Sequence, residues 1–270
     1  MLDCRAGEIV LTPREARWLC DRHKGIGADG IIMLLPSEAK DARMRIINAD
    51  GSEPEMCGNG VRALYLFASD LGALHKDSMS VETRSGEIKV TRARPSEGED
   101  MFVVDMGAPG MKRGDIPMEG PPDGEALHVG LEVPGAGHFD CTCVSMGNPH
   151  CVVFVDDLAS YPVCDVGPRI ERHHAFPEKT NVEFVRVSGS DLEVRVWERG
   201  AGETQACGTG ACAAVVAASS RGLSGRAANV SLPGGYLYID WKETVFMTGP
   251  ARRVFEGRIG GRDEVLKKAR

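Results

Sequence analysis

The strongest constraint on the fold is a segment that occurs twice along the chain. Each copy has two alternating apolar and polar runs, a polar loop, a cysteine followed by Gly-x-Gly, and then an apolar helical run. The two cysteines are Cys57 and Cys207, and the second follows the first by 150 positions. Because both order and spacing match, we expect two structurally related halves built from the same supersecondary unit.

The alternating runs predict a β-hairpin in each half. They cover residues 31–35 and 43–48 in the first copy, and residues 182–187 and 192–197 in the second. Alternation with a polar turn between two runs is typical of paired antiparallel strands. Two later apolar runs, residues 230–240 and 244–248, are also expected to be strands, whereas the opening of the chain shows no clear period.

Helices are predicted before the first hairpin and after each cysteine loop. A capping box with proline in the first turn predicts a helix over residues 13–22. The runs 61–71 and 211–221 predict two more helices, which end at Gly72 and Gly222. These two runs are apolar on nearly all sides, so we expect both helices to be buried.

The predicted fold class is therefore α+β, with two pseudo-symmetric domains that each wrap a mostly antiparallel sheet around a central helix. We expect the domains to cover residues 1–115 and 116–250, and residues 251–270 to return to the first domain. The glycine- and proline-rich stretch 106–124 is the expected linker. The N-termini of the two central helices should then meet near the cleft between the domains.

Composition limits the classes of partner. The net charge of −7 and the pI near 5.6 argue against nucleic acid or an anionic membrane surface, because both require a basic face. The sequence has neither an apolar run long enough to span a membrane nor a secretory signal pattern, so the expected location is the cytoplasm. In that reducing compartment the nine cysteines should remain thiols.

A cysteine at the start of a helix is chemically distinctive. The N–H groups of the first turn and the helix dipole stabilise negative charge, so we expect the pKa of such a thiol to fall. One such loop is weak evidence, since the cysteine can be a structural cap, but two matched copies favour a functional pair. Inverting a carbon stereocentre needs a base on one face and an acid on the other, which Cys57 and Cys207 would supply.

Two further residues are candidates for moving protons to and from these thiols. His150 follows a Gly-Asn-Pro turn, and Glu198 lies in a Trp-Glu-Arg-Gly segment at a predicted strand end. Each also has a structural interpretation. A single histidine after a turn is often only a satisfied structural residue, and a Glu-Arg pair is often only a surface ion pair.

Six motifs together resemble one enzyme family. They are Asn-Ala-Asp-Gly-Ser at 48–52, Glu-Met-Cys-Gly-Asn-Gly at 55–60, Gly-Asn-Pro-His at 147–150, Thr-Asn-Val at 180–182, Trp-Glu-Arg-Gly at 197–200 and Ala-Cys-Gly-Thr-Gly at 206–210. With this order they resemble diaminopimelate epimerases from about residue 21 to residue 257. The resemblance implies interconversion of LL- and meso-2,6-diaminopimelate in lysine and peptidoglycan-precursor synthesis, by a homodimer that uses neither pyridoxal phosphate nor a metal.

The resemblance also implies roles for particular residues. Cys57 and Cys207 match the acid–base pair, and His150 and Glu198 match the assisting residues. Matching the family's substrate-binding side chains and backbone amides are Asn48, Asn148, Asn181, Arg199, Gly58, Asn59, Gly208 and Thr209.

One segment of the family pattern has no match in this sequence. The family opens with a strand and a Gly-x-Gly-Asn-Asp-Phe-like turn, whose asparagine contacts the substrate. In the second half Asn148 precedes Asn181 by 33 positions. Gly30 is the first-half counterpart of Asn181, so the first-half counterpart of Asn148 would fall before Met1. We therefore expect a misassigned start or a shortened chain, with one sheet edge left unpaired.

Two alternatives share the same fold. Proline racemases and hydroxyproline epimerases resemble it and also pair two cysteines, but their first loop usually reads Cys-Gly-His-Gly where this chain has Asn59. An inactive binding protein on the same scaffold also stays open, because the expected N-terminal strand is absent.

A third alternative, from a different class, is a zinc-binding interaction module. Its ligands would come from Cys141, Cys143, His150, Cys151 and either His173 or His174. No two cysteine pairs have the spacing typical of structural zinc sites, so this alternative is weaker.

Overall fold

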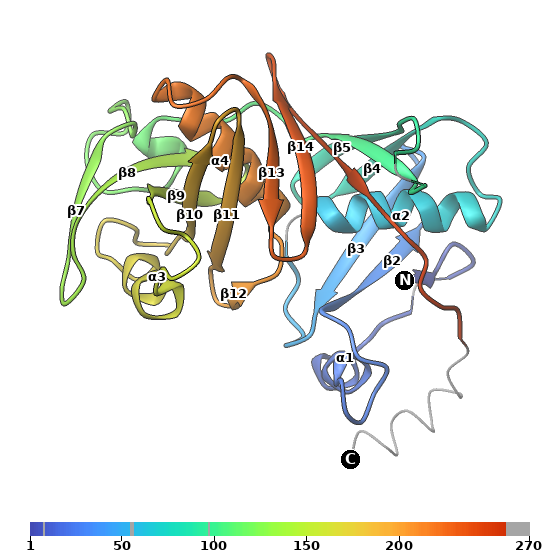
Figure 1. The fold of residues 1–270 in the computed structure, drawn as a ribbon. Helices are drawn as coiled ribbons and strands as arrows, with labels where there is room; N and C mark the ends of the chain where they lie inside the picture. The colour runs from blue at the N-terminus through green and yellow to red at the C-terminus, as the bar shows by residue number, and fades with distance from the viewer. Residues whose placement is uncertain (8, 55–56, 97, 258–270) are drawn as a thin grey trace. The chain divides into compact units, whose positions relative to one another are not determined.

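The computed structural model describes residues 1–7, 9–54, 57–96 and 98–257 (Figure 1). The chain divides into two compact units, residues 1–104 together with the segment from Pro250, and residues 105–249. The sequence placed the boundary near residue 115, and the assignment of two domains with those limits stays a prediction. Glu55 and Met56 of the first cysteine motif, and residues 258–270 of the predicted returning segment, lie outside the described residues.

The first unit contains a mixed sheet. Its strands, in spatial order, are β1 (Leu2–Asp3), β2 (Gly30–Leu35), β3 (Ala42–Asn48), β4 (Ser78–Thr83), β5 (Gly86–Arg92) and β6 (Met101–Asp105). Strands β2 and β3 are antiparallel and pair Gly30 with Asn48, which confirms the first predicted hairpin. The short β1 pairs parallel with β2, although its two residues are too few to show a sequence period.

The second unit contains a larger mixed sheet. Its order is β15 (Val245–Pro250), β14 (Gly235–Trp241), β13 (Ala227–Leu232), β11 (Asp191–Glu198), β10 (Asn181–Ser188), β9 (Pro149–Phe154), β8 (Gly137–Ser145) and β7 (Val129–Val133), and β12 (Gly202–Thr204) pairs with β11. Strands β10 and β11 form the second predicted hairpin. The single strand predicted over 230–240 is wrong, because Pro233 and Gly234 form the turn between β13 and β14.

The two sheets repeat the same succession of pairings. A parallel pair, β1–β2 or β9–β10, is followed by the antiparallel hairpin, β2–β3 or β10–β11. A second parallel pair, β3–β4 or β11–β13, is followed by another hairpin, β4–β5 or β13–β14. This repeat confirms the predicted α+β fold with two pseudo-symmetric halves.

The longer helices are α1 (Pro13–Cys20), α2 (Gly58–Asp70), α3 (Val163–Glu171) and α4 (Gly208–Ser220), and a 3₁₀ turn, η1, covers Arg113–Asp115. Helix α1 begins at the predicted capping box, in which Thr12 and Glu15 bond each other's backbone. Helices α2 and α4 follow the cysteines and are closed by Gly72 and Gly222, whose φ angles of +64° and +69° favour glycine. No helix in the described ranges is both long and apolar enough to cross a membrane.

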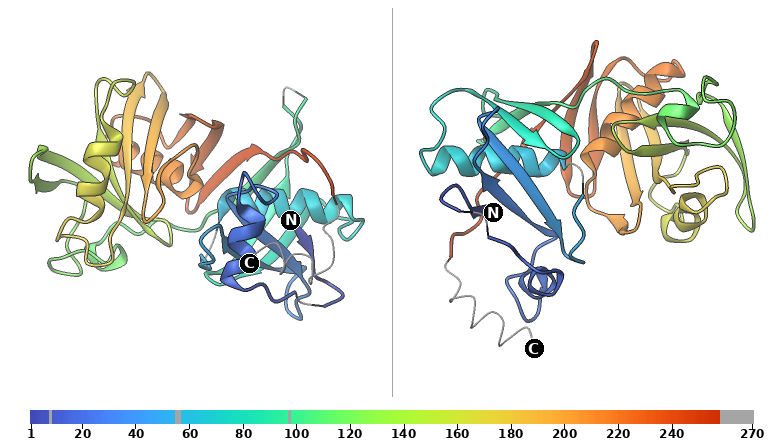
Figure 2. Two further views of the ribbon diagram at one scale, coloured as in Figure 1. Left: turned by 90° about the horizontal axis from the view of Figure 1, so that it is seen from below. Right: turned by 180° about the vertical axis from the view of Figure 1, so that it is seen from behind.

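The sheet of the second unit has a helix on each face (Figures 1 and 2). Helix α4 contacts β8 through β11, β13 and β14, and its residues from Ala211 to Ala218 are all buried. Helix α3 packs on the other face with Cys151 and Val182. Because successive residues of a strand point to opposite faces, His150 and Glu183 lie on the face that α4 covers.

Candidate active site

Each of the two predicted cysteines caps the helix that follows it. Cys57 has extended backbone angles (φ −144°, ψ 107°), and its Sγ accepts a hydrogen bond from the Gly60 N–H at 3.3 Å. Cys207 repeats this geometry (φ −125°, ψ 114°), with the Gly210 N–H at 3.4 Å from its Sγ. The predicted position of both cysteines at a helix start is confirmed, and each sulfur lies where first-turn amides can stabilise negative charge.

The glycines at the third position after each cysteine permit a close approach to a strand. A Cβ atom added to Gly60 would lie 2.6 Å from Cδ1 of Ile32 on β2, and one added to Gly210 would lie 2.7 Å from Oε1 of Glu183 on β10. Ile32 and Glu183 therefore occupy matching places behind the two loops. One loop rests on a hydrocarbon side chain, and the other rests on a carboxylate.

Four of the predicted residues are joined by hydrogen bonds in the second unit. His150 Nε2 lies 2.9 Å from Oδ1 of Asn148, and Asn148 Nδ2 donates to Oγ1 of Thr209 at 3.4 Å. Thr209 Oγ1 is in turn 3.4 Å from Sγ of Cys207. The structure thus brings His150, Asn148 and Thr209 together around the Cys207 thiol.

Glu198 also belongs to this group. It ends β11 on the α4 face, and its Oε1 accepts a hydrogen bond from Thr204 Oγ1 at 2.5 Å. Burial raises the pKa of Glu198, and the nearby Glu183 carboxylate raises it further, while hydrogen bonds from Thr204 and the Cys207 thiol act in the opposite direction. The contact with Cys207 makes Glu198 a proton-transfer candidate rather than half of a surface ion pair.

The expected fall in thiol pKa is wrong for Cys207. Burial raises the pKa of this thiol well above its ordinary value, and Glu198 and Glu183 raise it further. Hydrogen bonds from Thr209 and the Gly210 amide lower it, but they are outweighed. The helix N-terminus therefore does not determine the pKa of Cys207, because a buried thiolate beside two carboxylates would be poorly stabilised.

The side chain of Asn181 is hydrogen-bonded to the backbone of Arg199. The Asn181 side chain donates from Nδ2 to the Pro149 carbonyl at 2.9 Å and accepts the Arg199 N–H at 2.8 Å. The side chain of Arg199 is exposed and donates to the Glu178 carbonyl at 3.1 Å. Asn181 thus fixes the turn that carries Glu198 and Arg199 against the start of β9.

The predicted residues of the first unit lie beside the loop of Cys57 and at the end of β3. Asn48 Nδ2 donates to Oγ of Ser52 at 3.0 Å and so holds the turn after β3. Asn59 accepts a hydrogen bond from Arg62 at 2.9 Å, one turn along α2. Gly58 and Gly208 are the buried first residues of α2 and α4.

Sequence reasoning missed one residue of the second site, Glu183. Its side chain and that of His150 are both 0% exposed, and Nδ1 of His150 lies 2.7 Å from Oε1 of Glu183. The available signal was a carboxylate inside the apolar run 182–187. Charged side chains are almost never fully buried unless they are paired, so such a residue points to a buried partner.

The zinc-module alternative finds no support in the arrangement of its ligands. Within the described part of the chain, no three His, Cys, Asp or Glu side chains are grouped so that they could hold a metal ion. Cys151 faces α3, whereas its neighbour His150 faces α4 and is paired with Glu183. The proposed ligands therefore lie on two faces of one sheet.

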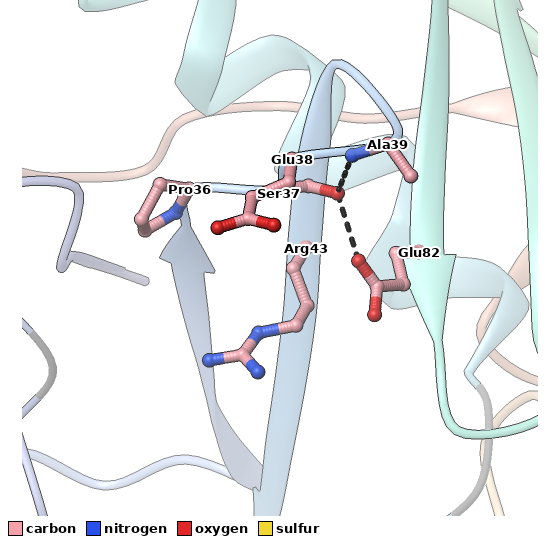
Figure 3. A pocket seen from close by; sticks show the side chains of 6 residues that line it. All are labelled: Pro36, Ser37, Glu38, Ala39, Arg43 and Glu82. Carbon is pink, nitrogen blue, oxygen red and sulfur yellow. Dashed lines mark hydrogen bonds between the residues drawn. The ribbon is translucent and has the colours of Figure 1, made fainter.

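A surface hollow lies in the first unit, at the turn between β2 and β3 (Figure 3). It is lined by Pro36, Ser37, Glu38, Ala39, Arg43 and Glu82. Ser37 Oγ donates to Glu82 at 2.8 Å across it. None of the predicted site residues lines this hollow.

Solved structures show the class to which the fold belongs. A probable proline racemase from Agrobacterium radiobacter matches with a TM-score of 0.65 at 16% identity, covering 88% of this chain and 78% of that one. A hydroxyproline epimerase from Agrobacterium vitis matches with the same TM-score at 15% identity, covering 88% and 77%. At these identities the likeness shows the fold alone, which this chain shares with those two proteins.

The sequence comparisons define the family within this class. The family model for diaminopimelate epimerase matches residues 1–112 and 142–254. Diaminopimelate epimerase 1 from a Nostoc species is 50% identical over 96% of this chain and 94% of its own length. The diaminopimelate epimerase of Pelotomaculum thermopropionicum is 51% identical over 88% and 86%. The chain belongs to the diaminopimelate epimerase family.

Proposed function

We propose that this chain is an isomerase that interconverts LL- and meso-2,6-diaminopimelate by moving the α-proton between Cys57 and Cys207. The observation that carries the proposal is the duplicated cysteine cap. In each unit a thiol stands at a helix start and accepts a first-turn amide hydrogen bond. Family membership and relatives at about 50% identity support diaminopimelate as the substrate.

The reaction needs one thiolate and one thiol at a time. The thiolate removes the α-proton from one face of the substrate, the C–H electron pair remains on the α-carbon, and the opposite thiol then delivers its own proton. The raised pKa of Cys207 suits it to start as the thiol that delivers a proton. His150 and Glu198 would return the two sulfurs to their starting protonation states.

The carbanion needs stabilisation, because the chain is proposed to use neither pyridoxal phosphate nor a metal. First-turn amides at a helix N-terminus favour bound carboxylates, and here they belong to Gly58, Asn59, Gly208 and Thr209. Asn48, Asn148, Asn181 and Arg199 are proposed to hold the rest of the substrate. Arg199 supplies an exposed cation suited to the distal carboxylate of a doubly charged amino acid.

The test is a conversion assay with purified protein, LL-diaminopimelate, a chelator and no added cofactor, read by chiral chromatography. We expect meso isomer from the wild type and a loss of about 10²- to 10⁴-fold in Cys57→Ala and Cys207→Ala, the range typical of general acid–base groups. Cys164→Ala is the control, because Cys164 is exposed and bonds Glu203 outside the site. Conversion that persists in either site variant would contradict the cysteine pair, and conversion of proline instead would favour the proline racemase alternative.

We further propose that the enzyme is a cytoplasmic homodimer that acts in lysine and peptidoglycan-precursor synthesis. Light scattering on the purified protein should give twice the chain mass of 29.0 kDa. A mass equal to one chain at working concentration would overturn the dimer and leave the proposed reaction untouched.

A further inference from the structure

The proposed reaction gives no role to the buried carboxylate of Glu183. Its Oε1 is bonded to His150, but its Oε2 is buried and has no hydrogen-bond partner among the described residues. An incompletely satisfied buried carboxylate is costly. A buried carboxylate in this state indicates a function, and the hydrogen bond that Glu183 does make is with His150, next to the Cys207 loop.

The fold itself does not require a carboxylate at this place. In the first unit the same loop, with its own cysteine cap and glycine, packs against Ile32. An aliphatic side chain therefore supports the loop geometry as well as a carboxylate does. The difference between Ile32 and Glu183 points to a task that only the second unit performs.

The contact with Glu183 determines which nitrogen of His150 can exchange a proton. An ionised carboxylate only accepts hydrogen bonds, so Nδ1 of His150 must be the donor. Nε2 is then the nitrogen on the side of Asn148, Thr209 and Cys207. As placed, the Asn148 amide presents Oδ1 to Nε2 and so accepts from a protonated Nε2. An unprotonated Nε2 is met when the amide turns over, so that its NH₂ group faces Nε2 and its oxygen faces Thr209 Oγ1.

We infer that Glu183 is a positioning residue that holds His150 with its proton on Nδ1 and so directs Nε2 to the side of Asn148, Thr209 and Cys207. The hydrogen-bonded series runs from Glu183 to His150, Asn148, Thr209 and the Cys207 sulfur, with distances of 2.7, 2.9, 3.4 and 3.4 Å. This inference rests on the proposed function for its kinetic consequence. The protonation of His150 can be measured without any turnover.

The first measurement is the nitrogen NMR spectrum of the wild type labelled with ¹⁵N-histidine, with His150 assigned by its loss in His150→Gln. We expect a protonated Nδ1 throughout the pH range in which the ring is neutral. In Glu183→Leu, which places an aliphatic side chain where the first unit has Ile32, the tautomers should become mixed. Glu183→Gln keeps an acceptor oxygen and should keep the Nδ1 proton.

The second measurement is the steady-state kinetics of the same variants with LL-diaminopimelate. Removing a carboxylate that orients a metal-bound histidine costs about 10- to 100-fold in activity. By analogy, we expect kcat of Glu183→Leu to fall in that range. KM should change little, because the Glu183 side chain is fully buried behind the Cys207 loop. Glu183→Gln should lie between the wild type and Glu183→Leu, which makes it the conservative rescue.

Glu15→Gln is the matched control, because Glu15 is also a buried carboxylate but serves the cap of α1. This variant should unfold at a lower temperature while its kcat and the His150 spectrum stay unchanged.

An unprotonated Nδ1 in the wild type, or wild-type kcat in Glu183→Leu, would overturn the inference. If Glu183→Leu does not fold, Glu183→Gln decides, since a kcat equal to that of the wild type there would also overturn it. An inactive wild type would refute the proposed function, and the NMR result would still decide the role of Glu183.

Discussion

At the scale of single residues, Cys207 and Glu198 control each other's proton affinity. Burial raises the pKa of both groups, and each carboxylate near the sulfur disfavours the thiolate further. A buried thiol in this setting stays protonated at neutral pH. It can therefore deliver a proton but needs help to recover one, which is the task proposed for His150 and Glu198.

Glu198→Gln tests this coupling directly. Replacing the carboxylate by a neutral amide removes a group that raises the pKa of Cys207, so that pKa should fall. A decrease of the Cys207 pKa by one pH unit increases the thiolate fraction about tenfold at a pH below the pKa. The measurement is the rate of iodoacetamide alkylation of Cys207 against pH, read by peptide mass spectrometry.

Glu203→Gln is the control for this experiment. Glu203 accepts a hydrogen bond from Cys164 and raises the pKa of that exposed thiol. The control should speed alkylation at Cys164 and leave the Cys207 profile unchanged. An unchanged or higher midpoint for Cys207 in Glu198→Gln would contradict the coupling.

Sequence alone predicts the residues whose signal is local. Cys57 and Cys207 stand before Gly-x-Gly and an apolar helix, so their place at a helix start can be recognised within a few positions. Glu183 could not be assigned in this way, because its partner His150 lies 33 positions earlier and meets it only through the parallel pairing of β9 with β10. The pKa direction for Cys207 was missed for the same reason, since burial depends on the whole sheet.

At the scale of elements, helix α4 is fastened at its C-terminal end by Arg221. The guanidinium donates to both carboxylate oxygens of Asp140 at 2.9 and 2.8 Å, to Thr142 Oγ1 at 2.6 Å and to the Leu127 carbonyl at 3.1 Å. Only 11% of the Arg221 side chain is exposed, compared with 52% of Asp140. This cluster ties the end of α4 to β8 and holds the helix along the sheet that carries the site.

Arg221→Met should lower the free energy of unfolding by about 1–3 kcal/mol at pH 7, the range for lost hydrogen bonds that involve a charged group. Burial alone would raise the pKa of Asp140, but hydrogen bonds from Arg221 and His128 lower it overall. A lowered folded-state pKa adds stability above the ordinary value near 3.8, and this stability is lost as the pH falls through the lower value. The difference between the wild type and the variant should therefore narrow in acid.

Urea unfolding of both proteins at pH 7 and in acid measures this difference. The comparison variant is Arg186→Met, which removes an exposed pair with Glu193 across the β10–β11 hairpin. Exposed ion pairs contribute little, so its effect should be smaller. Equal losses in the two variants, or a gap that widens in acid, would contradict the role given to Arg221.

The elements with strong local signals were predictable, and the others were not. The capping box before α1 and the two alternating hairpins follow from side-chain periods and caps. Helix α3 has no such signal, because Gly167 and Pro168 stand inside it and both disfavour helix. This helix depends on packing against the sheet of the second unit, on the face opposite α4.

At the scale of the whole molecule, one sheet topology is used twice, and the two copies have diverged in chemistry. Both units present a cysteine at a helix start, yet one loop is supported by Ile32 and the other by Glu183. The duplication itself was visible in the sequence, since the cysteine loops and hairpins recur at matching spacing. The difference between Ile32 and Glu183 could not be recognised there, because that requires knowing which strand position lies behind each loop.

In the proposed reaction two thiols, rather than one base, carry the proton. The most direct test is to follow LL-diaminopimelate in D₂O at low conversion and to measure α-deuterium separately in the product and in the recovered substrate. Because the delivering thiol has exchanged with solvent, two thiols should place deuterium in the meso product while the recovered LL isomer keeps its α-hydrogen. Equal deuterium in substrate and product from the earliest times would indicate a single exchanging base and would contradict the pair formed by Cys57 and Cys207.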